Sequence, residues 1–118
     1  MKTREEAITA CMTFPFVYED YPFHDENWTV MRHRENQKTF ALIFEHKGLL
    51  MVNVKAEPQA AELWRQVFPS VIPAYHMNKT HWIGIILDGT MPDEEIVRLI
   101  GDSYRLTAAR PRKGRNTE

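Results

Sequence analysis

The sequence predicts a single α+β domain in which a twisted antiparallel sheet carries its helices on one face. Apolar residues recur at helical spacing in three separate segments, and short strand-like runs with turn residues between them occupy the rest. No linker or repeat divides the 118 residues, a length that buries a core without disulfides or metals. The predicted order of elements is α-βββ-α-ββ-α.

The first helix is predicted from about Thr3 to Met12. Thr3 and Glu6 have the spacing of a capping box. An apolar stripe follows, made of Ile8, Cys11 and Met12. Phe14-Pro15 ends the helix, because proline disfavours helical geometry in the residue before it. Cys11 is the only cysteine and is expected to be a small buried thiol, not a nucleophile.

Residues 14–27 are predicted to form an irregular connection that is rich in aromatic side chains. Those side chains are Phe14, Phe16, Tyr18, Tyr21 and Phe23. Three strands are predicted next, over residues 28–33, 39–44 and 49–54, with polar turn residues between them. Such short connections favour antiparallel pairing.

A second helix is predicted between Glu57-Pro58 and Phe68-Pro69. Its apolar residues match the i, i+3, i+4, i+7 template and should pack on the sheet: Ala60, Leu63, Trp64 and Val67. Two further strands, over residues 71–75 and 82–87, flank a polar connection. Asp88-Gly89 is a strong turn signal.

The last helix is predicted to start near Pro92, because the fixed φ of proline suits the first helical position. Three acids follow at the positive end of the helix dipole. Its buried stripe should consist of Ile96, Leu99, Ile100 and Tyr104, and Pro111 limits its extent. The domain is therefore expected to span residues 1–110, followed by a basic, flexible tail over residues 111–118.

The net charge of −1 conceals an uneven distribution, because residues 1–97 carry −5 and residues 98–118 carry +4. A basic end on an acidic body can contact phosphates or another anionic partner. The alternative is that these charges belong to a solvated, frayed terminus.

The segment over residues 73–82 carries the densest group of candidate binding residues. Lys79 suits a phosphate contact, Asn78 a base edge or sugar, and Trp82 stacking on an exposed base. Two histidines add charge that depends on pH: His76 and His81. The alternative is structural, with the rings in the core and the histidines and the amide bonded to the backbone. Basic residues elsewhere complete the predicted nucleic-acid contacts: Arg32, Lys55, Arg110 and Arg112.

Metal, cofactor and catalytic chemistry are not expected. His76 and His81 lie five positions apart, which is not the spacing of a helical zinc site, and His24 with its neighbouring acids could complete a ligand set only through the fold. The chain has no phosphate-cradling glycine loop or dinucleotide fingerprint. It also lacks a signal-peptide pattern and an apolar run of membrane-spanning length, so a cytoplasmic protein is expected.

Several motifs together resemble the MmcQ/YjbR family of small bacterial proteins. They are Tyr18-Glu19-Asp20-Tyr21-Pro22-Phe23, Met51-Val52-Asn53-Val54-Lys55, Pro73-Ala74-Tyr75-His76-Met77-Asn78-Lys79, His81-Trp82, Leu87-Asp88-Gly89, Pro92-Asp93-Glu94-Glu95 and Asp102-Ser103-Tyr104. The resemblance implies a frataxin-like or secretion-chaperone-like fold and a DNA-binding role. The chain differs at Phe23-His24-Asp25, where a glycine commonly follows the phenylalanine, which puts the local turn in question.

The sequence and the resemblance together predict a small non-enzymatic binding protein with double-stranded DNA as its ligand. A sequence pI near 6.5 predicts that such binding is weak and falls as salt rises. The alternative is a protein-interaction or chaperone-like module that uses the sheet face or the aromatic loop over residues 14–23. A third role, small-molecule binding, would require a deep apolar cavity near Tyr75 and Trp82.

Overall fold

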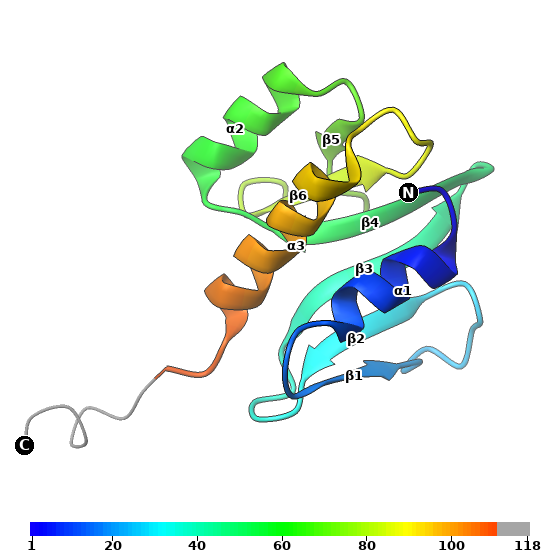
Figure 1. Ribbon diagram of the computed structural model, residues 1–118, viewed down its shortest axis with the longest axis vertical. Helices are drawn as coiled ribbons and strands as arrows, with labels where there is room; N and C mark the ends of the chain where they lie inside the picture. Colours follow the sequence, from blue (N-terminus) through cyan, green and yellow to red (C-terminus); the bar gives the residue numbers. More distant parts are fainter. Residues whose placement is uncertain (111–118) are drawn as a thin grey trace, which may run out of the picture.

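One antiparallel sheet of six strands forms the centre of the molecule in the computed structural model, which describes residues 1–110. The strands are β1 Val17–Asp20, β2 Thr29–His33, β3 Thr39–His46, β4 Leu49–Lys55, β5 Val71–Pro73 and β6 Trp82–Ile86. Their order across the sheet is β1-β2-β3-β4-β6-β5 (Figure 1). The predicted α+β class and antiparallel sheet are confirmed.

Three helices pack against this sheet: α1 Arg4–Met12, α2 Pro58–Val67 and α3 Asp93–Thr107. α3 crosses the central strands β3 and β4, α1 lies over β3 and β1, and α2 covers β5 and β6 at the other edge (Figure 1). Side chains from all three helices join one buried cluster with residues of the sheet, so the helices share one face, as predicted. The cluster includes Ala7, Val52, Ala61, Ile85 and Leu99.

The structure corrects the prediction for residues 14–27, because this segment contains the edge strand β1. All four of its residues pair with β2, from Val17 opposite His33 to Asp20 opposite Val30. An edge strand of four residues with only one buried side chain has no apolar alternation to reveal it. The strand predicted over residues 71–75 is also shorter than expected, since β5 starts at Val71 but stops at Pro73.

The predicted apolar stripes of α1 and α2 are partly wrong. Leu63 and Val67 of α2 are 54% and 52% exposed, whereas Ala61 is buried and packs with Trp64 and Phe68 in the core. α2 lies on the narrow edge formed by β5 and β6, so only one side of its apolar arc reaches the core. In α1, Met12 is exposed, while Ala7 and Cys11 are buried.

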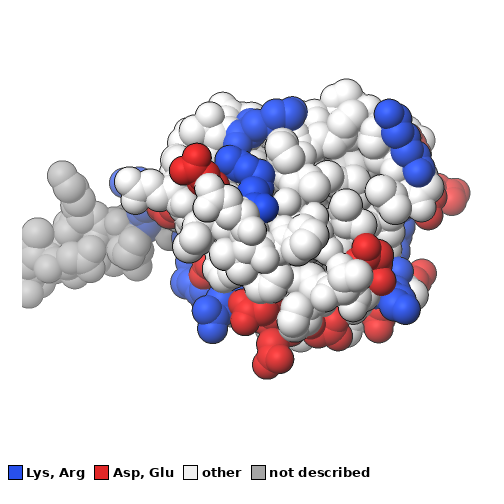
Figure 2. Space-filling model, turned by 90° about the horizontal axis from the view of Figure 1, so that it is seen from above, with Lys and Arg blue, Asp and Glu red and all other residues white. Residues whose placement is uncertain are grey.

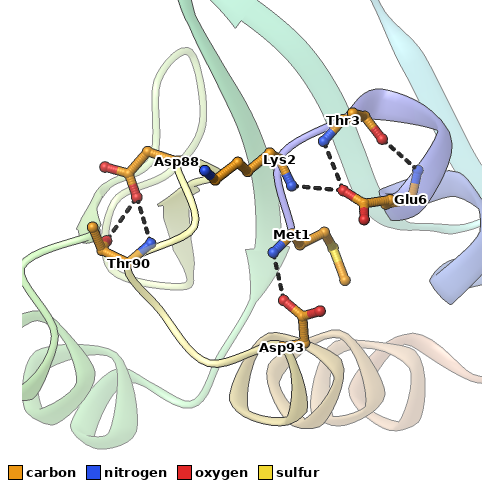
Figure 3. Close-up of polar contacts among 7 residues, drawn as sticks. All are labelled: Met1, Lys2, Thr3, Glu6, Asp88, Thr90 and Asp93. Atoms are coloured by element: carbon orange, nitrogen blue, oxygen red, sulfur yellow. Dashed lines mark hydrogen bonds and ion pairs between the residues drawn. The ribbon is translucent and has the colours of Figure 1, made fainter.

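A capping box fixes the start of α1, as its sequence predicts (Figure 3). The Glu6 N–H donates to Thr3 Oγ1 at 3.1 Å, and the N–H groups of Lys2 and Thr3 donate to Glu6 Oε1 at 2.7 and 3.0 Å. These backbone donors lower the pKa of the Glu6 carboxyl. The Met1 amino group donates to Asp93 Oδ1 at 2.5 Å, which ties this segment to the first turn of α3.

The Asp88-Gly89 turn is confirmed and leads from β6 into α3. Asp88 Oδ1 accepts from the backbone N–H of Thr90 at 3.0 Å and from its hydroxyl at 2.6 Å (Figure 3). These two donors lower the pKa of the Asp88 carboxyl. Gly89 has a φ of 88°, a left-handed conformation that glycine adopts without steric cost.

The hydroxyl of Ser103 links α3 to the two central strands. It donates to the carbonyl of Phe40 at 2.6 Å and accepts from the N–H of Lys55 at 2.8 Å. The β3–β4 pairing ends at Ala41 opposite Val54, so these two backbone groups are the next ones along the strands. The fully buried hydroxyl thus satisfies groups that the ladder no longer pairs.

His33 of β2 is a buried imidazole that also contacts α3. Its Nε2 lies 2.8 Å from Thr107 Oγ1. The Thr107 hydroxyl donates to the Ser103 carbonyl at 2.7 Å, so it accepts from His33, which assigns a proton to Nε2. Burial lowers the pKa of His33, although the Tyr104 carbonyl and the charge of Glu35 act in the opposite direction.

Replacing Ser103 by alanine should lower the free energy of unfolding by about 2–4 kcal/mol, because it orphans a buried N–H and a buried carbonyl at once. Urea denaturation measures the change. The matched control is Ser70→Ala, since that buried hydroxyl contacts only the Thr90 hydroxyl and should cost about 1 kcal/mol. Equal losses in the two variants would contradict the bridging role.

The free energy of unfolding should decrease as the pH is lowered through the range in which His33 takes up a proton. As the pH falls below about 6.5, the His33 pKa in the unfolded chain, the unfolded chain binds a proton that the folded chain does not. The free energy of unfolding therefore decreases with each further drop in pH until the lower pKa of His33 in the folded chain is passed. His33→Gln should lose this component in urea titrations at about pH 7.5 and about pH 5. The exposed His81→Gln is the control, and an unchanged pH dependence in His33→Gln would refute the assignment.

Candidate functional site

The face of the sheet opposite the helices carries a second set of apolar side chains. Ile43, Val52 and Ile85 belong to the helix-side core, and successive residues of a strand point to opposite faces. Their neighbours on the open face are also buried and include Leu42, Phe44, Met51, Asn53 and Gly84. Loops must therefore cover this face.

Two loops cover the open face and meet in an aromatic cluster. Trp28, from the loop before β2, stacks on Phe44 with ring centroids 4.3 Å apart. Tyr75, from the loop between β5 and β6, stacks on His46 at 3.8 Å and lies 3.9 Å from His76. The Trp28 and His76 rings are 6.3 Å apart, so the cluster joins the two loops above β3.

An open slot of about 330 Å³ lies between these loops. Its lining consists of Phe23, Asp25, Trp28, Leu42, His76 and Met77. Phe23 is 58% exposed and meets Trp28 edge to face at 6.2 Å, whereas Leu42 is buried on the sheet. The slot therefore has aromatic walls, an apolar base and one carboxylate.

Hydrogen bonds hold the loop on the Trp28 side of the slot. The Asn27 side chain donates to the Glu45 carbonyl at 3.0 Å and accepts from the Glu45 N–H at 2.8 Å. Arg4 of α1 donates to the Asn27 carbonyl at 2.8 Å, and Asp25 Oδ1 accepts from the Asn27 N–H at 2.8 Å. One oxygen of the Asp25 carboxylate is thus engaged by the loop itself.

The opposite loop is attached to the sheet through Asn53. Its side-chain amide donates to the Tyr75 carbonyl at 2.9 Å, and its Oδ1 is buried without a hydrogen-bond partner in residues 1–110. A Cβ added to Gly84 would lie 3.1 Å from that Oδ1 and 3.3 Å from the Met51 side chain. Only glycine at position 84 leaves room for this amide on the open face.

Two histidines at the slot adopt left-handed backbone conformations. The φ of His76 is 63° and that of His24 is 53°. His24 occupies the position where a glycine was expected from the family resemblance. The φ of His24 lies in the range that glycine favours. The turn at Phe23-His24-Asp25 therefore has the backbone conformation expected for a glycine, although a histidine occupies it.

Of the side chains predicted to contact a ligand between residues 76 and 82, one bonds to its own turn and others are exposed to solvent. Asn78 Oδ1 accepts from the N–H of Thr80 at 2.8 Å and of His81 at 3.3 Å, so this amide closes its own turn. Lys79 is exposed, and within residues 1–110 its ammonium donates only to the Met77 carbonyl, at 3.4 Å. The side chain of His81 is exposed, while its carbonyl accepts from the Ala56 N–H at 2.9 Å.

The sheet brings Arg32, Lys55 and Trp82 to one end of its open face. Lys55 lies directly opposite Trp82, and Arg32 lies opposite Thr39 across a bulge. Arg32 already donates to Asp20 Oδ2 at 2.8 Å and to the Gln37 carbonyl at 3.0 Å, so part of its charge is compensated.

Within the described residues, no contact joins Arg110 to this group. Arg110 is exposed beyond the end of α3, and Arg112 lies outside the described residues. On the face seen in Figure 2, basic side chains are few and many acids gather along the lower edge. That face presents no broad basic surface.

Other chemistry finds little support in the described part of the chain. Within residues 1–110, no three His, Cys, Asp or Glu side chains come together as a metal site requires. Cys11 is buried, as predicted, and burial raises the pKa of its thiol to about 12. None of the helices in this range has the length and apolar character of a bilayer-spanning helix.

Sequence reasoning did not identify the slot as a site, although Phe23 and Asp25 were noted separately. The usable signal was the run from Phe40 to Phe44, five consecutive apolar residues where a strand with one buried face would alternate. Such a run indicates that both faces of β3 are covered. It does not tell which loop covers the second face.

The comparisons with known proteins agree with the fold and identify the family. The YjbR family model matches residues 12–106. YjbR of Escherichia coli (strain K12) is 33% identical over 103 residues, which cover 87% of this chain and 85% of that protein. YyaQ of Bacillus subtilis (strain 168) is 32% identical over 118 residues and covers 91% of this chain and 99% of its own.

Solved structures give the same result. The crystal structure of Deinococcus radiodurans protein DR2400, a DUF419 domain, is 31% identical with a TM-score of 0.83, covering 97% of this chain and 85% of that one. A Pseudomonas syringae crystal structure is 30% identical with a TM-score of 0.81, covering 90% and 99%. The chain belongs to the YjbR family, whose DUF419 structures share its fold.

Proposed function

We propose that this protein is a non-enzymatic binding module that takes an aromatic side chain, carried by a basic segment of a partner protein, into the open-face slot. The observation that carries the proposal is the slot itself, which is open to solvent, about 330 Å³ in volume and lined mainly by carbon. Aromatic anchors seated in such pockets dominate many protein interfaces.

The lining of the slot favours an aromatic guest over an aliphatic one. Trp28 is fixed by stacking on Phe44, and Phe23 stands edge-on to it at the rim. A ring that enters the slot beside them can pack against the accessible surface of both rings. Met77 adds a polarisable thioether, which packs well against aromatic edges.

The charge around the slot favours a basic partner. Asp25 lies in the lining, and one of its oxygens is not used by the Asn27 N–H. Residues 1–97 carry a net charge of −5, with four acids between positions 19 and 26: Glu19, Asp20, Asp25 and Glu26. Complementary charge steers association and selects partners.

The non-enzymatic part of the proposal rests on the composition of the slot. It offers one carboxylate and one imidazole, from Asp25 and His76, and otherwise apolar or aromatic surface. Nucleophilic catalysis requires a nucleophile within hydrogen-bond reach of a base, and the lining contains no hydroxyl, thiol or amine side chain for that role.

Two matched peptides test this function by NMR titration of the ¹⁵N-labelled protein. Acetyl-Lys-Trp-Lys-amide should shift the amides of Phe23, Leu42 and Met77 with an affinity in the millimolar range, because one side chain supplies most of the contact. Acetyl-Glu-Trp-Glu-amide should bind more weakly, and Asp25→Asn should reduce the difference between the peptides.

Leu63→Ala is the matched control, since this exposed leucine lies on α2 outside the slot. It should bind both peptides as the parent protein does. Equal binding of the two peptides, or shifts that avoid the slot residues, would refute the proposal.

A second candidate function, DNA binding, is favoured by the row of residues at one end of the open face. Arg32, Lys55 and Trp82 share that end, and the exposed Lys79 and His81 precede Trp82 in the chain. Cations beside an aromatic ring suit a phosphate backbone with an exposed base. The Arg32–Asp20 ion pair and the few basic side chains nearby imply weak affinity.

A labelled DNA duplex should bind weakly if this second function holds, with anisotropy that falls as salt is raised from low to near-physiological concentration. The Lys79→Ala, His81→Ala double variant should bind more weakly still, because it removes the two free groups at that end. A folded protein that leaves the anisotropy unchanged at low salt would eliminate DNA as the ligand.

A further inference from the structure

One side of α2 faces the turn that contains Lys79 and Thr80, away from the open-face slot. Pro58, Glu62 and Arg65 follow one another at i, i+4 and i+7, so they line one side of the helix. Together with Gln59 and the turn, they surround an open cavity of about 400 Å³. Its lining contains two cations and one acid.

Arg65 has a guanidinium nitrogen without a partner. Its Nη1 is buried and makes no hydrogen bond within residues 1–110. Glu62, three residues earlier, is not among the carboxylates that form ion pairs within this range. A buried donor that lacks an acceptor is costly, and in folded proteins such groups commonly find an ion or another external partner.

Lys79 supplies a second cation that has no carboxylate partner in the described part of the chain. Its only contact there is the long one, 3.4 Å, to the Met77 carbonyl. The turn that carries it is nevertheless ordered, because Asn78 Oδ1 accepts from the Thr80 N–H at 2.8 Å. The turn thus places the Lys79 and Thr80 side chains at the rim of the cavity.

We propose that this cavity binds a phosphate group. Arg65 provides a planar fork of donors from α2, and Lys79 and Thr80 provide an ammonium and a hydroxyl from the turn. Donors that approach from two elements suit a tetrahedral oxyanion better than a planar carboxylate. Glu62 opposes binding and keeps the net charge of the lining at +1, so the affinity is moderate.

The position of the cavity near the start of α2 adds to this attraction. Gln59 lies in the first turn, where the helix dipole is positive, whereas the carboxylate of Glu57 at the N-cap opposes part of this attraction. The phosphate can belong to a small phosphorylated compound or to a nucleic-acid backbone, since both present the same oxygens.

Titration with inorganic phosphate, at ionic strength held constant with chloride, tests the site. The Arg65 Nε–H and the Thr80 amide should shift saturably in NMR spectra. Arg65→Gln should weaken binding about tenfold, the loss expected for one charged hydrogen-bond pair. Arg98→Gln, which removes an exposed arginine of α3 with a long 3.9 Å contact to Glu95, should leave binding unchanged.

Glu62→Gln should have the opposite effect to Arg65→Gln. Removing the acid should strengthen phosphate binding severalfold. Shifts that never saturate, or equal affinity in Arg65→Gln and the parent protein, would overturn the proposal. A labelled duplex distinguishes the two sources. If its binding also weakens in Arg65→Gln, the site takes backbone phosphates. If it does not, while phosphate binding is lost, the site takes a free phosphorylated compound.

Discussion

The fold depends on one buried hydroxyl, because Ser103 joins α3 to both central strands at the point where their pairing ends. Its bonds to the Phe40 carbonyl and the Lys55 N–H satisfy the end of the β3–β4 ladder and fix where β4 stops. α2 begins three residues after Lys55, so the contact also lies close to the point where the chain leaves the sheet toward α2. A hydrophobic contact at position 103 could not replace it, because the two backbone groups would remain unpaired.

Both faces of the central strands are covered. The helices cover one face, and the loops that form the candidate site cover the other. The helices bury Ile43 and Val52 on one face, while the loops bury Phe44 and Met51 on the other. A sheet with one solvated face would need only polar residues there. In this chain, aromatic side chains of the loops form a second layer over that face. The layer does not cover the face completely, and the uncovered part is the slot.

Local signals in the sequence predicted most elements, because each signal acts within a few residues. The capping box at Thr3 and the prolines that bound α2 are such signals. β1 was missed because its stability comes from pairing with β2 and not from its own pattern. The slot was missed for a related reason, since Trp28 and His76 meet only after β5 and β6 bring their loop over β3. The exposure of Leu63 and Val67 on α2 likewise depends on the sheet edge beneath the helix.

The loop between β5 and β6 connects the two candidate sites. His76 and Met77 line the slot, whereas Lys79 and Thr80 line the cavity beside α2. Asn78 stands between them, and its side chain closes the turn that carries Lys79 and Thr80. The density of functional residue types in this one segment follows from its serving two surfaces at once.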